Sequence, residues 1–221
     1  MHLVEHIIGV LAPHECLGCK DEGHLLCSKC ADALPALPSR CYRCNRATEN
    51  AHTCSVCNPH TNLRQVFVRT PYDNVAKALI HHLKFDRAQA AAADIAETLI
   101  PLLPKADTWV LCHIPTAPSR VRVRGYDQSQ RIAQELSRRA GIPWAHLLAR
   151  AHSVRQLGQN RAIRKEQISD AFRISSPQAV RGKHILLVDD VITTGATCEA
   201  AAKALHAAGA ASVSAVVFAA A

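Results

Sequence analysis

The stretch that decides the fold is ILLVDDVITTGAT, residues 185–197. Its first four residues are aliphatic, which predicts a strand buried in the core of a sheet. Asp189 and Asp190 follow at the carboxyl end of that strand, and a short threonine-rich turn with Gly195 then opens into a helix. Two adjacent carboxylates at the end of a buried strand, directly before such a turn, indicate a ligand site.

The turn has the chemistry of an anion-binding site. It offers successive backbone N–H groups, two hydroxyls and a helix N-terminus, all of which bind phosphate. The candidate phosphate-binding residues are Val191, Ile192, Thr193, Thr194, Gly195, Ala196 and Thr197. Because carboxylates repel phosphate, we expect Asp189 and Asp190 to face ribose hydroxyls or a hydrated Mg²⁺. The structural alternative is a strand, a tight turn and a helix capped by Thr197.

Apolar periodicity elsewhere predicts strands that alternate with helices. Strands are expected at 65–69, 109–114, 145–148, 185–188 and 213–218. Helices are expected after Asp73, at about 88–103, after a capping pair at Asp127 and Gln130, and at 197–208. This alternation predicts an α/β fold with a mostly parallel sheet flanked by helices, in which ligands bind beyond the carboxyl ends of the strands.

Eight of the ten cysteines lie between residues 16 and 57, in four C-x-x-C pairs. The pairs are Cys16/Cys19, Cys27/Cys30, Cys41/Cys44 and Cys54/Cys57. Two such pairs complete a tetrahedral Cys₄ site, so four pairs predict two structural Zn²⁺ sites, as in zinc ribbons. The first pair can join the second and the third the fourth, or the pairs can be cross-braced. His24 and His52 are nearby substitutes, although eight cysteines suffice.

Other uses of these cysteines fit the sequence less well. A disulfide framework is typical of secreted chains, and the N-terminal residues lack the basic region of a secretory signal. A redox C-x-x-C usually occurs once, and an iron–sulfur cluster uses the same ligand type. A segment of this size buries little core by itself, so we expect the metal to hold it together.

Pro59 closes the cysteine-rich region, so we expect a boundary near residue 60. Residues 1–60 would form a small double zinc-ribbon domain, and residues 61–221 would form the α/β domain. An apolar run long enough to cross a membrane is absent from the sequence. We therefore expect a cytoplasmic protein without a membrane span.

Positive charge is concentrated in one part of the chain. The formal net charge is +8, and residues 120–165 alone hold eleven basic and two acidic side chains. Such a stretch is typical of a surface that binds phosphate or nucleic acid, or of a solvated helix face next to a basic loop.

The aliphatic run followed by D-D-x-x-T-T-G resembles the phosphoribosyl-pyrophosphate (PRPP) loop of type I phosphoribosyltransferases. Cysteine pairs followed by this domain resemble the ComF family, which includes ComFC and GntX-type proteins, over essentially the whole chain. Lys84 stands where that family has a helix-ending lysine, His113-Ile114-Pro115 resembles its V-P turn, and residues 124–128 resemble its R-G-F-N-Q signature. Residues 156–172 resemble a further family segment that contains Arg164, with Gln159 and Gln167 as departures.

The resemblance implies a type I phosphoribosyltransferase-like fold that binds PRPP with Mg²⁺. Asp189 and Asp190 would be the catalytic pair that holds the ribose hydroxyls and stabilises a developing oxocarbenium ion. The pyrophosphate, or the phosphates of a nucleic acid, would contact Pro115, Arg124, Arg155, Arg161 and Arg164.

The resemblance also implies a role in natural transformation or the use of external DNA, with single-stranded DNA and other competence proteins as partners. The enzyme hypothesis is a Mg²⁺-dependent phosphoribosyltransferase with an unnamed acceptor. The alternatives are a non-catalytic single-stranded DNA-binding accessory protein and a PRPP-sensing regulator on a transferase fold.

Overall fold

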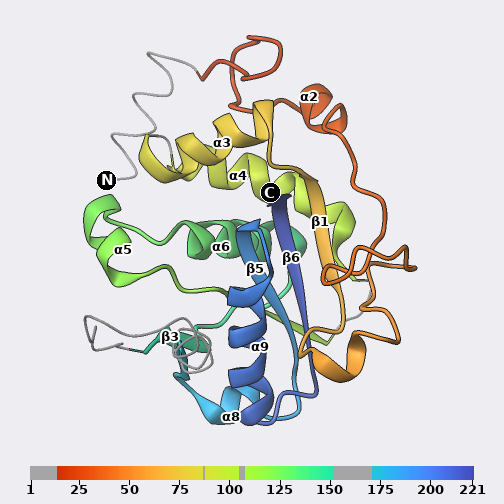
Figure 1. Ribbon diagram of the computed structural model, residues 1–221. Coiled ribbons are helices and arrows are strands. Elements are labelled where there is room, and N and C mark those ends of the chain that lie inside the picture. Colours follow the sequence, from red (N-terminus) through yellow and green to blue (C-terminus); the bar gives the residue numbers. More distant parts are fainter. Residues whose placement is uncertain (1–13, 87, 105–107, 152–170) are drawn as a thin grey trace, which may run out of the picture.

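A parallel sheet with the strand order β1-β6-β5-β2 forms the centre of the computed structural model (Figure 1), which describes residues 14–86, 88–104, 108–151 and 171–221. The strands of this sheet are β1 (Val66–Pro71), β2 (Trp109–His113), β5 (His184–Ile192) and β6 (Ser212–Ala220). A separate antiparallel pair consists of β3 (Leu148–Arg150) and β4 (Phe172–Ile174). The predicted mostly parallel sheet is therefore confirmed.

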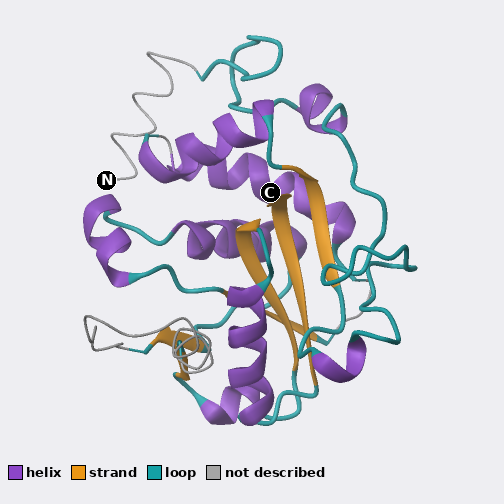
Figure 2. Ribbon diagram, viewed as in Figure 1, coloured by secondary structure: helices purple, strands orange, loops and turns teal. Residues whose placement is uncertain are grey.

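Helices cover both faces of the sheet (Figure 2). The longer helices are α3 (Asn74–Phe85), α4 (Ala88–Leu99), α6 (Gln128–Ala140) and α9 (Ala196–Ala207). The short ones are α2 (Ser28–Asp32), η1 (Asn58–His60), η2 (Ile100–Leu102), α5 (Pro118–Arg124) and α8 (Pro177–Val180). Side chains of β5 alternate between the two layers, since Leu186 and Val188 pack with α3, α4 and α6, whereas Ile185 and Leu187 pack with α9.

The strand that carries the decisive motif is longer than its aliphatic run. The run predicts a strand over residues 185–188, but β5 continues to Ile192 because Asp189, Val191 and Ile192 still pair with β6. The two acidic residues therefore lie inside the strand, two residues before its end, and not at the start of the turn. Their backbones are fixed by the sheet.

Most other predicted elements are confirmed with small shifts. Asp127 caps α6 by accepting hydrogen bonds from the N–H groups of Ser129 and Gln130. The strand predicted at 145–148 is displaced, because only Trp144 bridges to the sheet and β3 begins at Leu148. The final turn of the predicted helix 88–103 is the 3₁₀ helix η2, whose N-terminal part contains Pro101. The short helix α5 has no counterpart among the predicted elements.

The first cysteine segment shares the core of the α/β layers. Leu25, Leu26 and Leu34 belong to the same buried cluster as α3 and α4. The backbone N–H of Leu26 donates to Asp94 Oδ2 over 2.9 Å, and Asp94 is only 9% exposed. Arg69 of β1 donates to backbone carbonyls in the following stretch of the same segment. The segment is thus fastened to α4 and to β1.

Within the part of the chain that the structure describes, no helix combines the length and apolar character needed to cross a bilayer.

Asp94→Ala should lower the free energy of unfolding by roughly 1–3 kcal/mol, because the buried N–H of Leu26 would lose its acceptor. Urea denaturation measures this loss. Glu97→Ala is the matched control on the same helix, since Glu97 is 61% exposed and pairs with Arg139 at the surface. Equal effects of the two substitutions would contradict the proposed anchoring role of Asp94.

Candidate functional site

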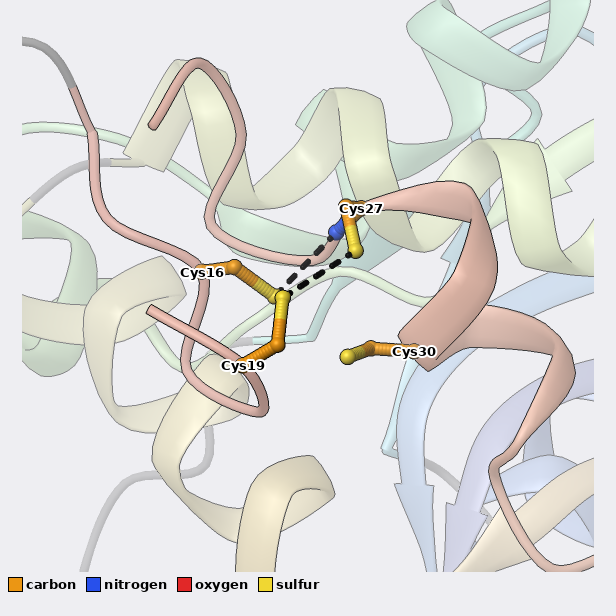
Figure 3. A group of neighbouring side chains, drawn as sticks. All are labelled: Cys16, Cys19, Cys27 and Cys30. Carbon is orange, nitrogen blue, oxygen red and sulfur yellow. Dashed lines mark hydrogen bonds between the residues drawn. The ribbon is translucent and has the colours of Figure 1, made fainter. Parts of the chain in front are cut away.

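The eight N-terminal cysteines form two tetrads. Their sulfur atoms lie within 4.8 Å of one another in each group, and the groups are Cys16, Cys19, Cys27 and Cys30, and Cys41, Cys44, Cys54 and Cys57. Figure 3 shows the four side chains of the first group converging from a loop and from the start of α2. The structure therefore joins the first pair with the second and the third with the fourth, and not in the cross-braced order.

The tetrads have the donor set of closed structural zinc sites. At Cys16 and Cys41 burial disfavours the thiolate, but backbone hydrogen bonds outweigh it and lower the pKa of each to about 6. At Cys57 burial and the neighbouring cysteines raise the pKa to about 12. Thiolates are the form that binds metal. Four sulfurs around one centre could hold Zn²⁺ and would leave no open position for catalysis. His24 is not part of the first tetrad and instead contacts Asp94.

The turn after β5 presents one open face. Thr193, Thr194, Ala196 and Thr197 are exposed, whereas Gly195 is buried. Gly195 is the N-cap of α9 with a φ of +74°, a conformation that favours glycine. Because Gly195 is the N-cap, Thr197 lies within the first turn of α9 and is not the capping residue, whereas the Thr194 hydroxyl accepts a hydrogen bond from the Ala196 N–H. The hydroxyls and the helix N-terminus are thus available to an anion from solvent.

The acidic pair beside this turn is held by two helices. Lys84 Nζ at the end of α3 lies 2.6 Å from Asp190 Oδ2. The Ser129 hydroxyl in the first turn of α6 donates to Asp189 Oδ1 over 2.8 Å. Burial, and then the adjacent Asp190 carboxylate, raise the pKa of Asp189 well above its usual value. The site therefore favours a ligand that brings hydroxyl donors or positive charge to these oxygens.

The loop after β2 reaches the same edge of the sheet. The Thr116 backbone N–H and hydroxyl both donate to Asp127, which joins the loop to the start of α6. Arg150 Nε donates to the Pro115 carbonyl over 2.9 Å. Arg124 lies nearby at the end of α5, where its guanidinium donates to Gln128 Oε1 and stacks over Phe85.

The structure brings the candidate residues of two segments to one edge: residues 189–197, which are the end of β5 and the turn after it, and the loop that starts at Pro115. Arg155, Arg161 and Arg164 lie outside the described residues. The sequence pattern gives no role to Ser129 and Arg150, and it marks Lys84 only through the family resemblance. Helical spacing places Lys84 in the last turn of α3, but its meeting with Asp190 depends on how α3 packs across the sheet.

A cavity of about 1020 Å³ adjoins the turn. It shares Ile192 and Thr193 with the turn, and its other walls come from β1, from η2 and from the second cysteine segment. Phe67, Val68 and Leu102 make part of the lining apolar, and Arg40 and Arg43 add positive charge. None of the described residues that line it carries an acidic side chain. The cavity therefore suits an uncharged or anionic molecule with a flat apolar surface.

Comparison with known proteins first indicates the class of protein that the α/β part of the chain resembles. A family model described as a phosphoribosyl transferase domain matches residues 127–221, which include β5, the turn and α9. Among solved structures, glutamine PRPP amidotransferase from B. subtilis superimposes with a TM-score of 0.43 at 21% identity, over 58% of this chain and 26% of that one. The family match over residues 127–221, together with the parallel sheet, identifies the α/β part of the chain as a type I phosphoribosyltransferase fold.

Two relatives cover more of the chain. DNA utilization protein YhgH of Salmonella typhi is 33% identical over 144 residues, which are 61% of this chain and 63% of the relative. Competence protein F of Haemophilus influenzae is 27% identical over 210 residues, which are 86% and 90% of the two chains. These matches support the resemblance of the chain to the ComF family. It spans slightly less than two thirds of the YhgH relatives that it matches.

His113 gives the stability of the folded protein a predictable pH dependence. The side chain is buried at the end of β2 beside Trp144 and His146. Burial lowers its pKa to about 4, with the Asp127 charge opposing the shift and His146 adding to it. In the unfolded chain the ring binds a proton below about pH 6.5, whereas the folded protein keeps it neutral down to about pH 4. Stability from this group is therefore lost as the pH falls through that window.

We expect His113→Leu to remove about 2 kcal/mol of the loss in unfolding free energy between about pH 7 and about pH 5. Urea unfolding at the two pH values measures the difference. His81→Ala is the control, because the His81 side chain is 64% exposed. An unchanged pH dependence in His113→Leu would show that other groups cause the acid sensitivity.

Proposed function

We propose that this chain binds PRPP through residues 189–197 and acts in the uptake or use of external DNA. The observation that carries the first part is the turn after β5, which exposes its hydroxyls and a helix N-terminus directly beside two fixed carboxylates. A sugar that carries a phosphate at one end and free hydroxyls at its ring matches both halves of this site.

In this proposal the turn and the acidic pair hold different parts of PRPP. The hydroxyls of Thr193, Thr194 and Thr197 and the backbone N–H groups of the turn would bind the 5′-phosphate. Asp189 and Asp190 would accept hydrogen bonds from the ribose hydroxyls. Their negative charge would stabilise positive charge that develops at C1′ when the bond to pyrophosphate breaks. The new bond at C1′ would form to an acceptor entering from the cavity that shares Thr193.

Mg²⁺ fits the oxygen donors at this edge of the sheet, because carboxylates and phosphate oxygens are its usual ligands. When bound with PRPP, Mg²⁺ would neutralise charge on the departing pyrophosphate. The loop at Pro115, with Arg124 and Arg150 beside it, would lie along the pyrophosphate. Lys84 would pair with the Asp190 carboxylate until the ribose hydroxyls arrive.

The role in DNA use rests on the relatives, which are named DNA utilization protein YhgH and Competence protein F. The basic stretch 120–165 supports contact with single-stranded DNA. Other competence proteins are natural partners in that process. We place the protein in the cytoplasm, where reducing conditions keep cysteines available as metal ligands.

Calorimetric titration of the zinc-loaded protein with PRPP, with and without Mg²⁺, tests the site. We expect Mg²⁺-dependent binding that the double substitution Asp189→Ala/Asp190→Ala weakens at least about 100-fold, because the ribose loses its acceptors and the site its charge. Zinc content should stay the same, since the tetrads lie elsewhere. PRPP binding of unchanged affinity in the double variant would refute the assignment.

Single-stranded DNA binding is tested by its dependence on salt. Replacing Arg155, Arg161 and Arg164 with alanine should lower the affinity for an oligonucleotide and reduce the salt slope by about one unit for each phosphate that the variant no longer neutralises. Fluorescence anisotropy at several salt concentrations measures both. Lys203→Ala is the control, because that exposed side chain lies on α9 and outside residues 120–165. A slope equal to that of the wild type would place the DNA-binding surface outside residues 155–164.

A further inference from the structure

The second cysteine segment touches the phosphate-binding turn through one side chain. Tyr42 directly follows Cys41, a member of the second tetrad, and its ring covers Gly195. A Cβ atom placed on Gly195 would lie 2.9 Å from Tyr42 Cε2 and 3.0 Å from Cδ2. The ring therefore fills the space behind the turn, and its close packing accounts for the burial of Gly195 while its neighbours stay exposed.

The same segment also holds the helix that the turn opens into. The Tyr42 hydroxyl donates a hydrogen bond to Glu199 Oε1 in the first turn of α9. Glu199 Oε2 accepts two more, from the backbone N–H and the side-chain amide of Asn62, each over 3.0 Å. Asn62 lies five residues beyond Cys57. The half-buried Glu199 carboxylate thus binds Tyr42, inside the first C-x-x-C pair of the second tetrad, and Asn62, beyond its last cysteine.

This arrangement fixes three points around the turn. The strand β5 holds its start, Tyr42 covers Gly195 from behind, and Glu199 ties the first turn of α9 to Tyr42 and Asn62. Four cysteine ligands around one metal would keep residues 41–57 in a single conformation, so the position of Tyr42 depends on that metal. In contrast, the first tetrad is anchored to α4 through Leu26 and Asp94.

We infer that Tyr42 is a positioning residue for the phosphate-binding turn, and that the second cysteine tetrad, but not the first, sets the affinity of that turn for a phosphorylated sugar. The inference builds on the proposed PRPP site, since the ligand is the one proposed there. It adds a specific dependence on one of the two metal sites and names the side chains that transmit it.

The first experiment needs no ligand. Amide hydrogen exchange of residues 191–199 is followed in the zinc-loaded full chain. Tyr42→Phe keeps the ring but loses the bond to Glu199, so exchange in this segment should become faster. Tyr72→Phe is the matched control, because Tyr72 packs against the hydrophobic cluster on the other side of the sheet from Tyr42. Unchanged exchange in Tyr42→Phe and also in Tyr42→Ala would overturn the inference.

The second experiment compares the two tetrads. Cys19→Ser and Cys44→Ser each change an exposed cysteine that ends the first C-x-x-C pair of its tetrad. Each variant should lose about one zinc equivalent. We expect Cys44→Ser and Tyr42→Ala to weaken Mg²⁺-dependent PRPP binding about tenfold, a coupling of ordinary size. Cys19→Ser should bind PRPP as the wild type does, and equal losses in Cys19→Ser and Cys44→Ser would overturn the inference.

The two experiments separate failure of this inference from failure of the proposed function. A wild-type protein that binds no PRPP would refute the proposed ligand, while the exchange measurement would still decide whether Tyr42 holds the turn. If Cys44→Ser fails to fold, Tyr42→Phe remains informative because it leaves both tetrads intact. Faster exchange without any change in PRPP affinity would show that the turn is held but that its order does not control binding, which would overturn the second half of the inference.

Discussion

Two adjacent carboxylates at the end of a central strand are the constraint on which the rest of the structure depends. The strand β5 pairs with β2 on one side and with β6 on the other, and the pairing with β6 continues through the acidic pair. Desolvation penalises both charges at this position, so each needs a partner. Lys84 and Ser129 supply these partners from α3 and α6. The end of one helix and the start of another must therefore meet at this edge.

Small side chains let the helices reach that position. Aromatic residues make up only 4% of the chain, and α4 buries Ala91, Ala92 and Ala96 completely. Alanine-rich faces allow helices to approach closely, but each residue buries little apolar surface. The first cysteine segment adds Leu25 and Leu26 to this layer and uses Asp94 to satisfy a backbone N–H there. The cysteine-rich part thus completes the core as well as carrying the tetrads.

The sequence allowed the parallel fold, the cysteine tetrads and the strand, turn and helix around residues 185–197 to be predicted, because each depends on local patterns. Aliphatic runs, C-x-x-C spacing and a glycine in a tight turn act within a few residues of one another. The partners of the acidic pair could not be predicted, since Lys84 and Ser129 lie far from that pair in the chain and meet it only through packing. The extent of β5 was also underestimated, because pairing with β6 overrides the change from aliphatic to acidic residues.

The contact between Tyr42 and Gly195 gives a physical reason for the second cysteine tetrad to lie beside the proposed sugar-phosphate site. A glycine with a positive φ gives the turn its shape but has no side chain to anchor it, and a loose turn must lose conformational entropy when a phosphate binds. Support has to come from another segment, and Tyr42 provides it from the position after a cysteine ligand. The short segment that carries these two pairs of cysteines has little core of its own. A bound metal would therefore hold the segment, and with it the Tyr42 ring, in place. The conformational order of the turn after β5 would then depend on metal binding at the second tetrad.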